Sequence, residues 1–150
     1  MNQPGFRHGK VCNRIGRRIG NFVEDHDLGH TLSNDSGIVT ERDPDTVRGA
    51  DVSFFSYRRV PKDKEPVGYP NAVPELVFEV VSPSNTWSEI HTKVRECLLA
   101  GVNVVTVLDP GTKAAHVYSP DGKSLELEGD SKLQYADLPG FSLPVRKLFE

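Results

Sequence analysis

The feature that most constrains the fold is a succession of strand, helix and strand between residues 75 and 108. Residues 75–82 form the most apolar run of the chain and predict a central strand. Residues 84–86, which are Ser, Asn and Thr, offer N-caps for a following helix that Gly101 closes. A second apolar strand is expected over residues 102–108. A helix between two buried strands implies a right-handed crossover, so these strands should lie parallel in one sheet.

Upstream of this unit, apolar residues recur at helical spacing and predict a first helix. This helix is expected to end near residues 24–28, where Gly29 can adopt the left-handed conformation that stops it. Residues 29–33 and 37–40 then predict a hairpin, with residues 34–37 as its turn. The periodic apolar residues of the helix are Val11, Ile15, Ile19, Phe22 and Val23.

Three further strands are expected, over residues 50–57, 114–118 and 124–128. Residues 58–71 read as a long loop rich in proline and lysine, and the tail over residues 138–149 is expected to pack against the sheet edge. The whole pattern predicts one α/β domain over residues 1–150, with a mixed β-sheet flanked by helices. Residues 1–9 are polar and without periodicity, and they are expected to be flexible.

Composition narrows the class of protein. One hundred and fifty residues are enough for one domain with a real core. The net charge of −3 argues against nonspecific nucleic-acid binding by the whole surface, although a local basic patch remains open. Cys12 and Cys97 belong to no metal-binding or redox motif, which predicts structural thiols in a reducing compartment. No apolar run has the length of a membrane span, and we expect a cytoplasmic protein without a membrane partner.

One carboxylate stands out because it lies inside an apolar strand. Burying Glu79 without a partner would cost several kcal/mol, so it needs a cation, either a metal ion or a lysine. Lys93 follows fourteen residues later, on the flank of the apolar stripe of the second predicted helix. Asp51 lies in the strand over residues 50–57. Glu75 shares a strand face with Glu79 but lies about 13 Å away, so Asp51 is the better partner for one ion.

The same residues carry a resemblance to a known family. The segments RGADVSFFS, PELVFEVVSPSN, GVNVVTVLDP and LPGFSLPV, together with the lysine-bearing helix, resemble the Uma-type family of "putative restriction endonucleases". That family is built on the PD-(D/E)XK nuclease core, and the resemblance runs from about His8 onward. It implies that Asp51 and Glu79 are the two acidic residues of the core. The lysine two residues after the second acid would fall at Val81, and the family pattern passes its role to Lys93.

The resemblance and the residue pattern together predict a magnesium-dependent endodeoxyribonuclease, a hydrolase acting on ester bonds. Asp51 and Glu79 would hold Mg²⁺, or Mn²⁺ in its place, with the carbonyl of Val80 as a third ligand. Lys93 would orient the attacking water or stabilise charge in the transition state. A homodimer is also expected, since nuclease cores of this kind often pair.

Basic side chains on the first helix and in the long loop are candidates for contacts with the phosphate backbone of DNA. They are Arg14, Arg18, Arg58, Arg59 and Lys62, with Lys10, Arg17 and Lys64 beside them.

Each of these assignments has a structural alternative. Glu79 could be a surface carboxylate at a strand end, Asp51 could cap a turn, and Lys93 could pair with Glu89 one helical turn before it. The five histidines form no HExxH motif, which disfavours a zinc site, and His8 is only a candidate substrate contact. The alternative function is a non-catalytic nucleic-acid-binding or interaction module that retains the nuclease core.

Overall fold

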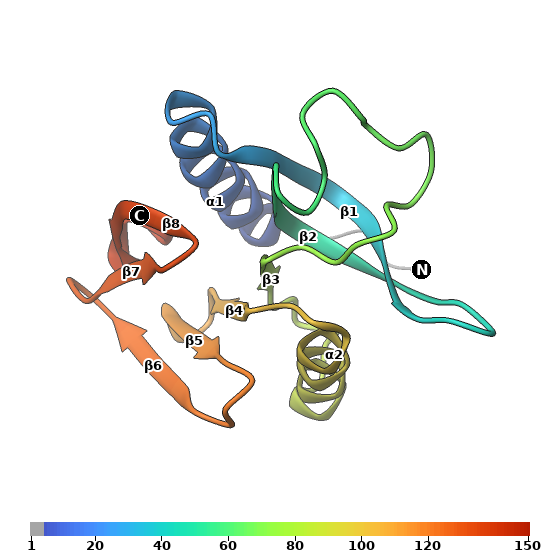
Figure 1. Ribbon diagram of the computed structural model, residues 1–150. Coiled ribbons are helices and arrows are strands. Elements are labelled where there is room, and N and C mark those ends of the chain that lie inside the picture. The colour runs from blue at the N-terminus through green and yellow to red at the C-terminus, as the bar shows by residue number, and fades with distance from the viewer. Residues whose placement is uncertain (1–4) are drawn as a thin grey trace.

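The computed structural model describes residues 5–150 and contains a six-stranded mixed sheet with a helix on each face (Figure 1). Strands β1 to β6 follow one another in chain order across the sheet. β3 and β4 are parallel and are joined by α2, as the strand–helix–strand pattern predicts, and the other neighbours are antiparallel. The predicted α/β fold with a mixed sheet is therefore confirmed.

The elements in chain order are α1 (Phe6–Asp25), β1 (Gly29–Glu41), β2 (Thr46–Ser56), β3 (Leu76–Val80), α2 (Trp87–Ala100), β4 (Val104–Asp109), β5 (Ala114–Tyr118), β6 (Ser124–Glu128), β7 (Lys132–Tyr135), β8 (Leu138–Pro144) and a 3₁₀ helix, η1 (Val145–Leu148).

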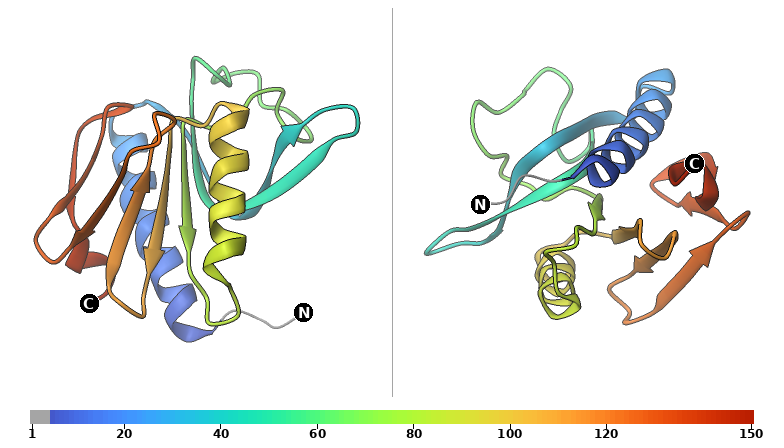
Figure 2. Two further views of the ribbon diagram at one scale, coloured as in Figure 1. Left: turned by 90° about the horizontal axis from the view of Figure 1, so that it is seen from below. Right: turned by 180° about the vertical axis from the view of Figure 1, so that it is seen from behind.

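The two helices lie on opposite faces of the sheet, so the fold has two separate hydrophobic cores (Figure 2). The larger core packs the α1 stripe against the inner residues of β2 to β5 and against the C-terminal segment. The smaller core lies under α2, which buries Val94 and Cys97. The α1 stripe consists of Val11, Ile15, Ile19 and Val23, so its four-residue spacing carries one face of the helix into the core.

The first helix ends at Asp25, within the predicted range of residues 24–28, but its start and the residue that stops it differ from the prediction. It begins at Phe6, so residues 6–9 are helical, whereas they were expected to be flexible; residues 1–4 lie outside the described part of the chain. The left-handed residue after the helix is Asp27, not Gly29. Gly29 is already in β1, where a Cβ would lie 2.1 Å from the carbonyl oxygen of Phe55. Glycine is needed there because two strands approach closely, not because a helix stops.

The predicted hairpin within residues 29–40 is wrong. β1 runs through this segment without a turn and pairs with β2, and the register shifts between Ser33 and Ser36. Asn34 and Asp35 adopt left-handed conformations within this bulge. Asn and Asp favour a bulge for the same reason that they favour a turn, since both tolerate positive φ. The real turn lies between Glu41 and Thr46, so β2 also begins four residues earlier than predicted.

The C-terminal segment covers a face of the sheet and does not merely line its edge, as the tail was expected to do. β7 and β8 form a two-stranded sheet that the sequence analysis did not predict as such, and η1 follows. The hydroxyl of Tyr135 on β7 hydrogen-bonds Thr106 of β4 at 2.8 Å. Leucines at positions 133, 138, 143 and 148 are buried in the larger core. The segment thus completes the layer that α1 begins.

None of the helices between residues 5 and 150 combines the length and the hydropathy that crossing a membrane requires.

Candidate active site

The candidate site lies where β2 and β3 stop pairing. Their ladder joins Phe54 to Leu76, Ser53 to Val77 and Val52 to Phe78. One residue further, the side chain of Asp51 replaces the backbone of β2, because its Oδ2 accepts the backbone N–H of Val80 at 2.8 Å. Asp51 therefore caps the open end of a strand, not a turn. This places its carboxylate between two strands at the level of Glu79.

Glu79 is held by the lysine that the sequence analysis singled out. Its side chain is only 16% exposed, and its Oε1 lies 2.9 Å from Nζ of Lys93. The ammonium also donates to the backbone carbonyl of Gly49 on β2. Among the ion pairs of residues 5–150, the one that Lys93 makes is with Glu79 and not with Glu89. Glu79 is thus no surface carboxylate, and α2 delivers a cation to the end of β3.

The groups around Glu79 shift the pKa of its carboxyl in opposite directions. Burial is the main reason that its pKa rises from 4.5 to about 7. The negative charges of Asp51 and Asp35 raise the pKa further, while the ammonium of Lys93 lowers it. One lysine therefore does not fully compensate this buried carboxylate, and protonation takes place near neutral pH.

A cavity of about 590 Å³ opens in front of this ion pair. It lies between the β1–β2 ribbon and α2, and its lining includes Asp35, Gly49, Glu79, Val80 and Lys93. Asp35 was predicted to lie in a turn, but the bulge turns its carboxylate into this cavity. A Cβ on Gly49 would lie 2.2 Å from an oxygen of Asp35, so the carboxylate packs directly against the glycine. The left-handed conformation that carries Asp35 there depends on the bulge, which the sequence alone does not distinguish from a turn.

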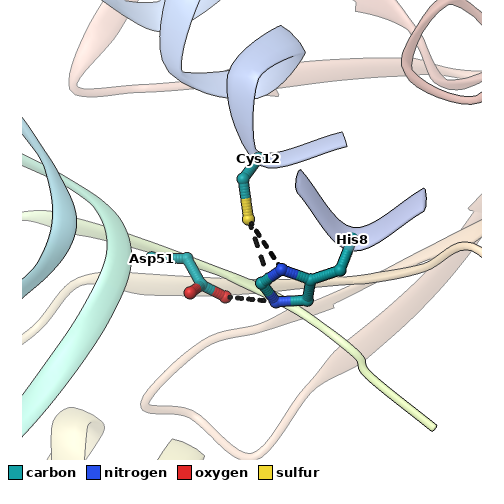
Figure 3. A group of neighbouring side chains, drawn as sticks. All are labelled: His8, Cys12 and Asp51. Carbon is teal, nitrogen blue, oxygen red and sulfur yellow. Dashed lines mark hydrogen bonds and ion pairs between the residues drawn. The ribbon is translucent and has the colours of Figure 1, made fainter. Parts of the chain in front are cut away.

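On its other side, Asp51 meets two residues from the start of α1 (Figure 3). His8 Nε2 lies 3.6 Å from Oδ2 of Asp51, and the sulfur of Cys12 lies 3.6 Å from Nδ1 of His8. Burial, together with the charges of Asp51 and Glu79, raises the pKa of the Cys12 thiol to about 12. From the sequence, His8 was only a candidate substrate contact and Cys12 was expected to be structural. Their spacing of four residues became informative only once the structure showed that α1 begins at Phe6 and that Asp51 faces His8.

The basic residues predicted to contact phosphate differ in how many contacts their charged groups already make within the protein. Arg59 donates to the carbonyls of Val73, Pro74 and Gly101, and its Nε lies 3.6 Å from Glu75, a fully buried carboxylate. These contacts use its guanidinium within the fold, so Arg59 is not available for DNA in this structure. Arg58 has a side chain that is 78% exposed, and its Nη2 lies 3.7 Å from Oε2 of the same Glu75.

The other candidates lie on or near α1. Lys62 pairs with Asp27 at the surface, 2.9 Å apart. Arg14 is half-buried and Arg18 is exposed.

The comparisons with known proteins agree with this architecture. The profile of the Uma2 family, described as "Putative restriction endonuclease", matches residues 1–146. Among solved structures, a "putative nuclease belonging to DUF820" from Anabaena variabilis superposes with a TM-score of 0.87. The alignment covers 99% of this chain and 83% of that chain at 18% sequence identity, which shows a shared fold. No curated protein matches the sequence. Because the family profile spans nearly the whole chain, the protein belongs to the Uma2 family of nuclease-like proteins.

Proposed function

We propose that the protein is a metal-dependent endonuclease that hydrolyses phosphodiester bonds of DNA. The observation that carries this proposal is the Glu79–Lys93 pair at the wall of a cavity, with the carboxylate of Asp51 at the same level of the neighbouring strand. Membership of a family described as restriction endonucleases supports a nucleic-acid substrate. Asp51, Glu79 and Lys93 are the proposed catalytic residues.

The residues present suit a hard divalent cation such as Mg²⁺ or Mn²⁺. Asp51 and Glu79 supply carboxylate oxygens, which such ions prefer. The N–H of Val80 points to Asp51, and the N–H and C=O of one strand residue point to the same side, so its carbonyl faces the same gap. The raised pKa of Glu79 indicates a buried negative charge that one lysine does not fully compensate. A bound Mg²⁺ would supply Lewis-acid activation of the phosphate and of a water molecule.

Lys93 has two functions in this proposal. Its ammonium holds the Glu79 carboxylate in a fixed position, and it is braced by the carbonyl of Gly49. The same ammonium borders the cavity in which the scissile phosphate would lie. A preorganised cation there stabilises the extra negative charge of the transition state without reorganising solvent. Removing one such preorganised group typically lowers turnover by about 10²–10³-fold.

The proposed DNA surface rests on basic residues whose side chains are at least partly exposed, although Arg58 lies 3.7 Å from Glu75 and Lys62 pairs with Asp27. Arg58 follows β2 and lies 3.7 Å from Glu75, a residue about 13 Å along the strand from Glu79, so it would contact a neighbouring phosphate and not the scissile one. Arg14, Arg18 and Lys62 are the other candidates. Arg59 is left out because its guanidinium is used within the fold.

One observation favours a second candidate function. Glu79 already has a cation partner in Lys93, and the net charge of the chain is −3. A module that binds nucleic acid or another partner without cleaving it would need no metal ion beside the Glu79–Lys93 pair. The two functions differ in metal binding, because only the nuclease requires an ion between Asp51 and Glu79.

Nicking of supercoiled plasmid tests the proposal. We expect the wild type to nick DNA with millimolar Mg²⁺ and to be inactive with a chelator. Glu79→Gln should abolish nicking and weaken Mg²⁺ binding in calorimetry. Lys93→Met keeps the alkyl stem, so it should retain metal binding and lose about 10²–10³-fold in rate.

Glu89→Gln is the matched control, since Glu89 lines the same cavity without contacting the Glu79–Lys93 pair, and it should nick like the wild type. Equal nicking by all four proteins would reveal a contaminating nuclease and remove the support for catalysis. A folded wild type that neither binds Mg²⁺ nor nicks DNA would favour the non-catalytic module.

A further inference from the structure

A second group of metal-binding side chains lies on the α1 side of the same strand end. His8 and Cys12 are four residues apart on α1 and therefore project from one face of the helix. Asp51 on β2 faces them, and Figure 3 shows the three side chains converging. The distance from His8 Nε2 is 3.6 Å to Asp51 Oδ2 and 3.9 Å to Cys12 Sγ. One ligand atom from each residue lies within 4.8 Å of both others.

We propose that His8, Cys12 and Asp51 form a binding site for a thiophilic divalent cation such as Zn²⁺. Zinc lies roughly 2.0–2.3 Å from nitrogen, oxygen and sulfur ligands, so the ligand atoms of a tetrahedral site are about 3.3–3.6 Å apart. The two distances from His8 Nε2, 3.6 Å to Asp51 and 3.9 Å to Cys12, lie at or a few tenths of an ångström beyond the upper end of that range, and the ligand atoms of Cys12 and Asp51 lie within 4.8 Å of each other. The three ligand atoms must therefore move closer together for an ion to contact all of them.

The donor set distinguishes this site from the proposed magnesium site. A thiolate, an imidazole and a carboxylate favour Zn²⁺ or Co²⁺ over Mg²⁺, which prefers oxygen ligands alone. Binding converts the Cys12 thiol to a thiolate and releases its proton to solvent. The backbone N–H of Val80 orients the Asp51 carboxylate, as outer hydrogen bonds do for metal ligands generally. The two sites share Asp51 and differ in every other ligand.

The site is also accessible. The side chains of His8 and Asp51 are 13% and 18% exposed, so neither is sealed in the core. A cavity of about 330 Å³ borders His8 and is lined by the first turn of α1 and by the segments after β3 and β4. Three protein ligands leave the fourth position of a tetrahedral ion open to water or to another ligand.

Cobalt binding tests the site without any assay of DNA cleavage. Tag-free protein, kept reduced with a reductant that lacks thiols, is titrated with Co²⁺ and followed by near-ultraviolet absorption. We expect a thiolate-to-cobalt charge-transfer band that saturates at one ion per chain, disappears when Zn²⁺ displaces Co²⁺ and persists in excess Mg²⁺. Cys12→Ala should abolish the band, and His8→Ala should weaken Co²⁺ binding at least about tenfold.

Two control variants test whether the band arises from Cys12 and its neighbours. Cys97→Ala removes the other cysteine of the sequence, which lies in the core under α2, and should keep the band. Glu79→Gln alters the proposed nuclease site and should also keep it, so failure of catalysis and failure of this site are distinguishable. The proposal is overturned if the wild type shows no band, if the band follows Cys97, or if folded His8→Ala binds Co²⁺ as tightly as the wild type does.

Discussion

Glu79 shows how a single residue can be held between two ionisation states. Its folded pKa of about 7 exceeds the ordinary value of 4.5 because burial and the charge of Asp51 outweigh the attraction of Lys93. The folded protein therefore binds this proton more tightly than the unfolded chain does. As a consequence, Glu79 does not weaken the fold below pH 4.5, and it weakens the fold increasingly as the pH rises from 4.5 to about 7.

This linkage predicts a pH-dependent difference between the wild type and Glu79→Gln, which does not titrate. The penalty for ionised Glu79 should reach about 3 kcal/mol above pH 7, since each unit of pH contributes about 1.4 kcal/mol. The stability of the variant relative to the wild type should rise by about that amount between pH 4.5 and roughly pH 8. Urea unfolding in the presence of a chelator measures it. A difference that stays constant with pH would show that the pKa of Glu79 is not shifted.

At the scale of the secondary-structure elements, the ends of α2 could be predicted from the sequence, whereas the bulge in β1 could not. Thr86, one of the three predicted N-cap candidates, caps α2 by accepting the N–H of Glu89, and Gly101 ends the helix in a left-handed conformation, as predicted. These are contacts within one turn of a helix, so the local sequence determines them. The Asn-Asp-Ser-Gly segment of β1 permits either a turn or a bulge. The choice depends on pairing with β2, which is not a local property.

The same distinction applies to the candidate site. Asp51, Glu79 and Lys93 could be selected from the sequence because each lies in a strongly patterned strand or helix. Asp35 could not, because only the bulge of β1 brings it to the cavity. The neighbourhood of Cys12 also depends on how far α1 extends toward its N-terminus and on where it crosses β2.

Two glycines, one at the end of α2 and one within α1, provide a test of local conformation with opposite expected signs. Gly101→Ala places a Cβ at φ +114° and 3.3 Å from Val73, so it should destabilise the protein by about 1–2 kcal/mol. Gly9→Ala lies within α1, where an added Cβ meets nothing within 4 Å, and should stabilise it by about 0.5–1 kcal/mol. Urea unfolding of both variants checks the signs, and two changes of the same sign would contradict these conformational assignments.

At the scale of the whole molecule, the C-terminal segment is part of the main core. β7, β8 and η1 insert apolar side chains beside α1, and Tyr135 links them to β4 through Thr106. From the sequence, the tail over residues 138–149, which carries Pro139, Gly140 and Phe141, was expected to pack against the sheet edge. Its function in covering a sheet face follows from contacts with residues more than a hundred positions earlier in the chain, such as Ile15.

Truncating one leucine of this segment should therefore affect the entire fold. Leu138 is fully buried on β8, so Leu138→Ala should cost about 2–5 kcal/mol, from lost burial and the cavity left behind. Leu125 on β6 is the matched control, because its side chain is 61% exposed, and Leu125→Ala should change stability by less than about 0.5 kcal/mol. Denaturant unfolding compares the two. Similar costs would mean that the tail is not integrated into the core.

The parallel β3–α2–β4 unit has one more consequence. The acid of the candidate pair sits on β3, whereas its cation sits on α2, which is docked by the smaller of the two cores. The pair therefore forms only once the helix has docked, and the docked state is stabilised in return by the closed pair. The ion pair therefore couples the candidate site to the packing of α2 on the sheet. A ligand that separates Lys93 from Glu79 would weaken that packing, and a substitution in the core under α2 would change the position of Lys93 in the site.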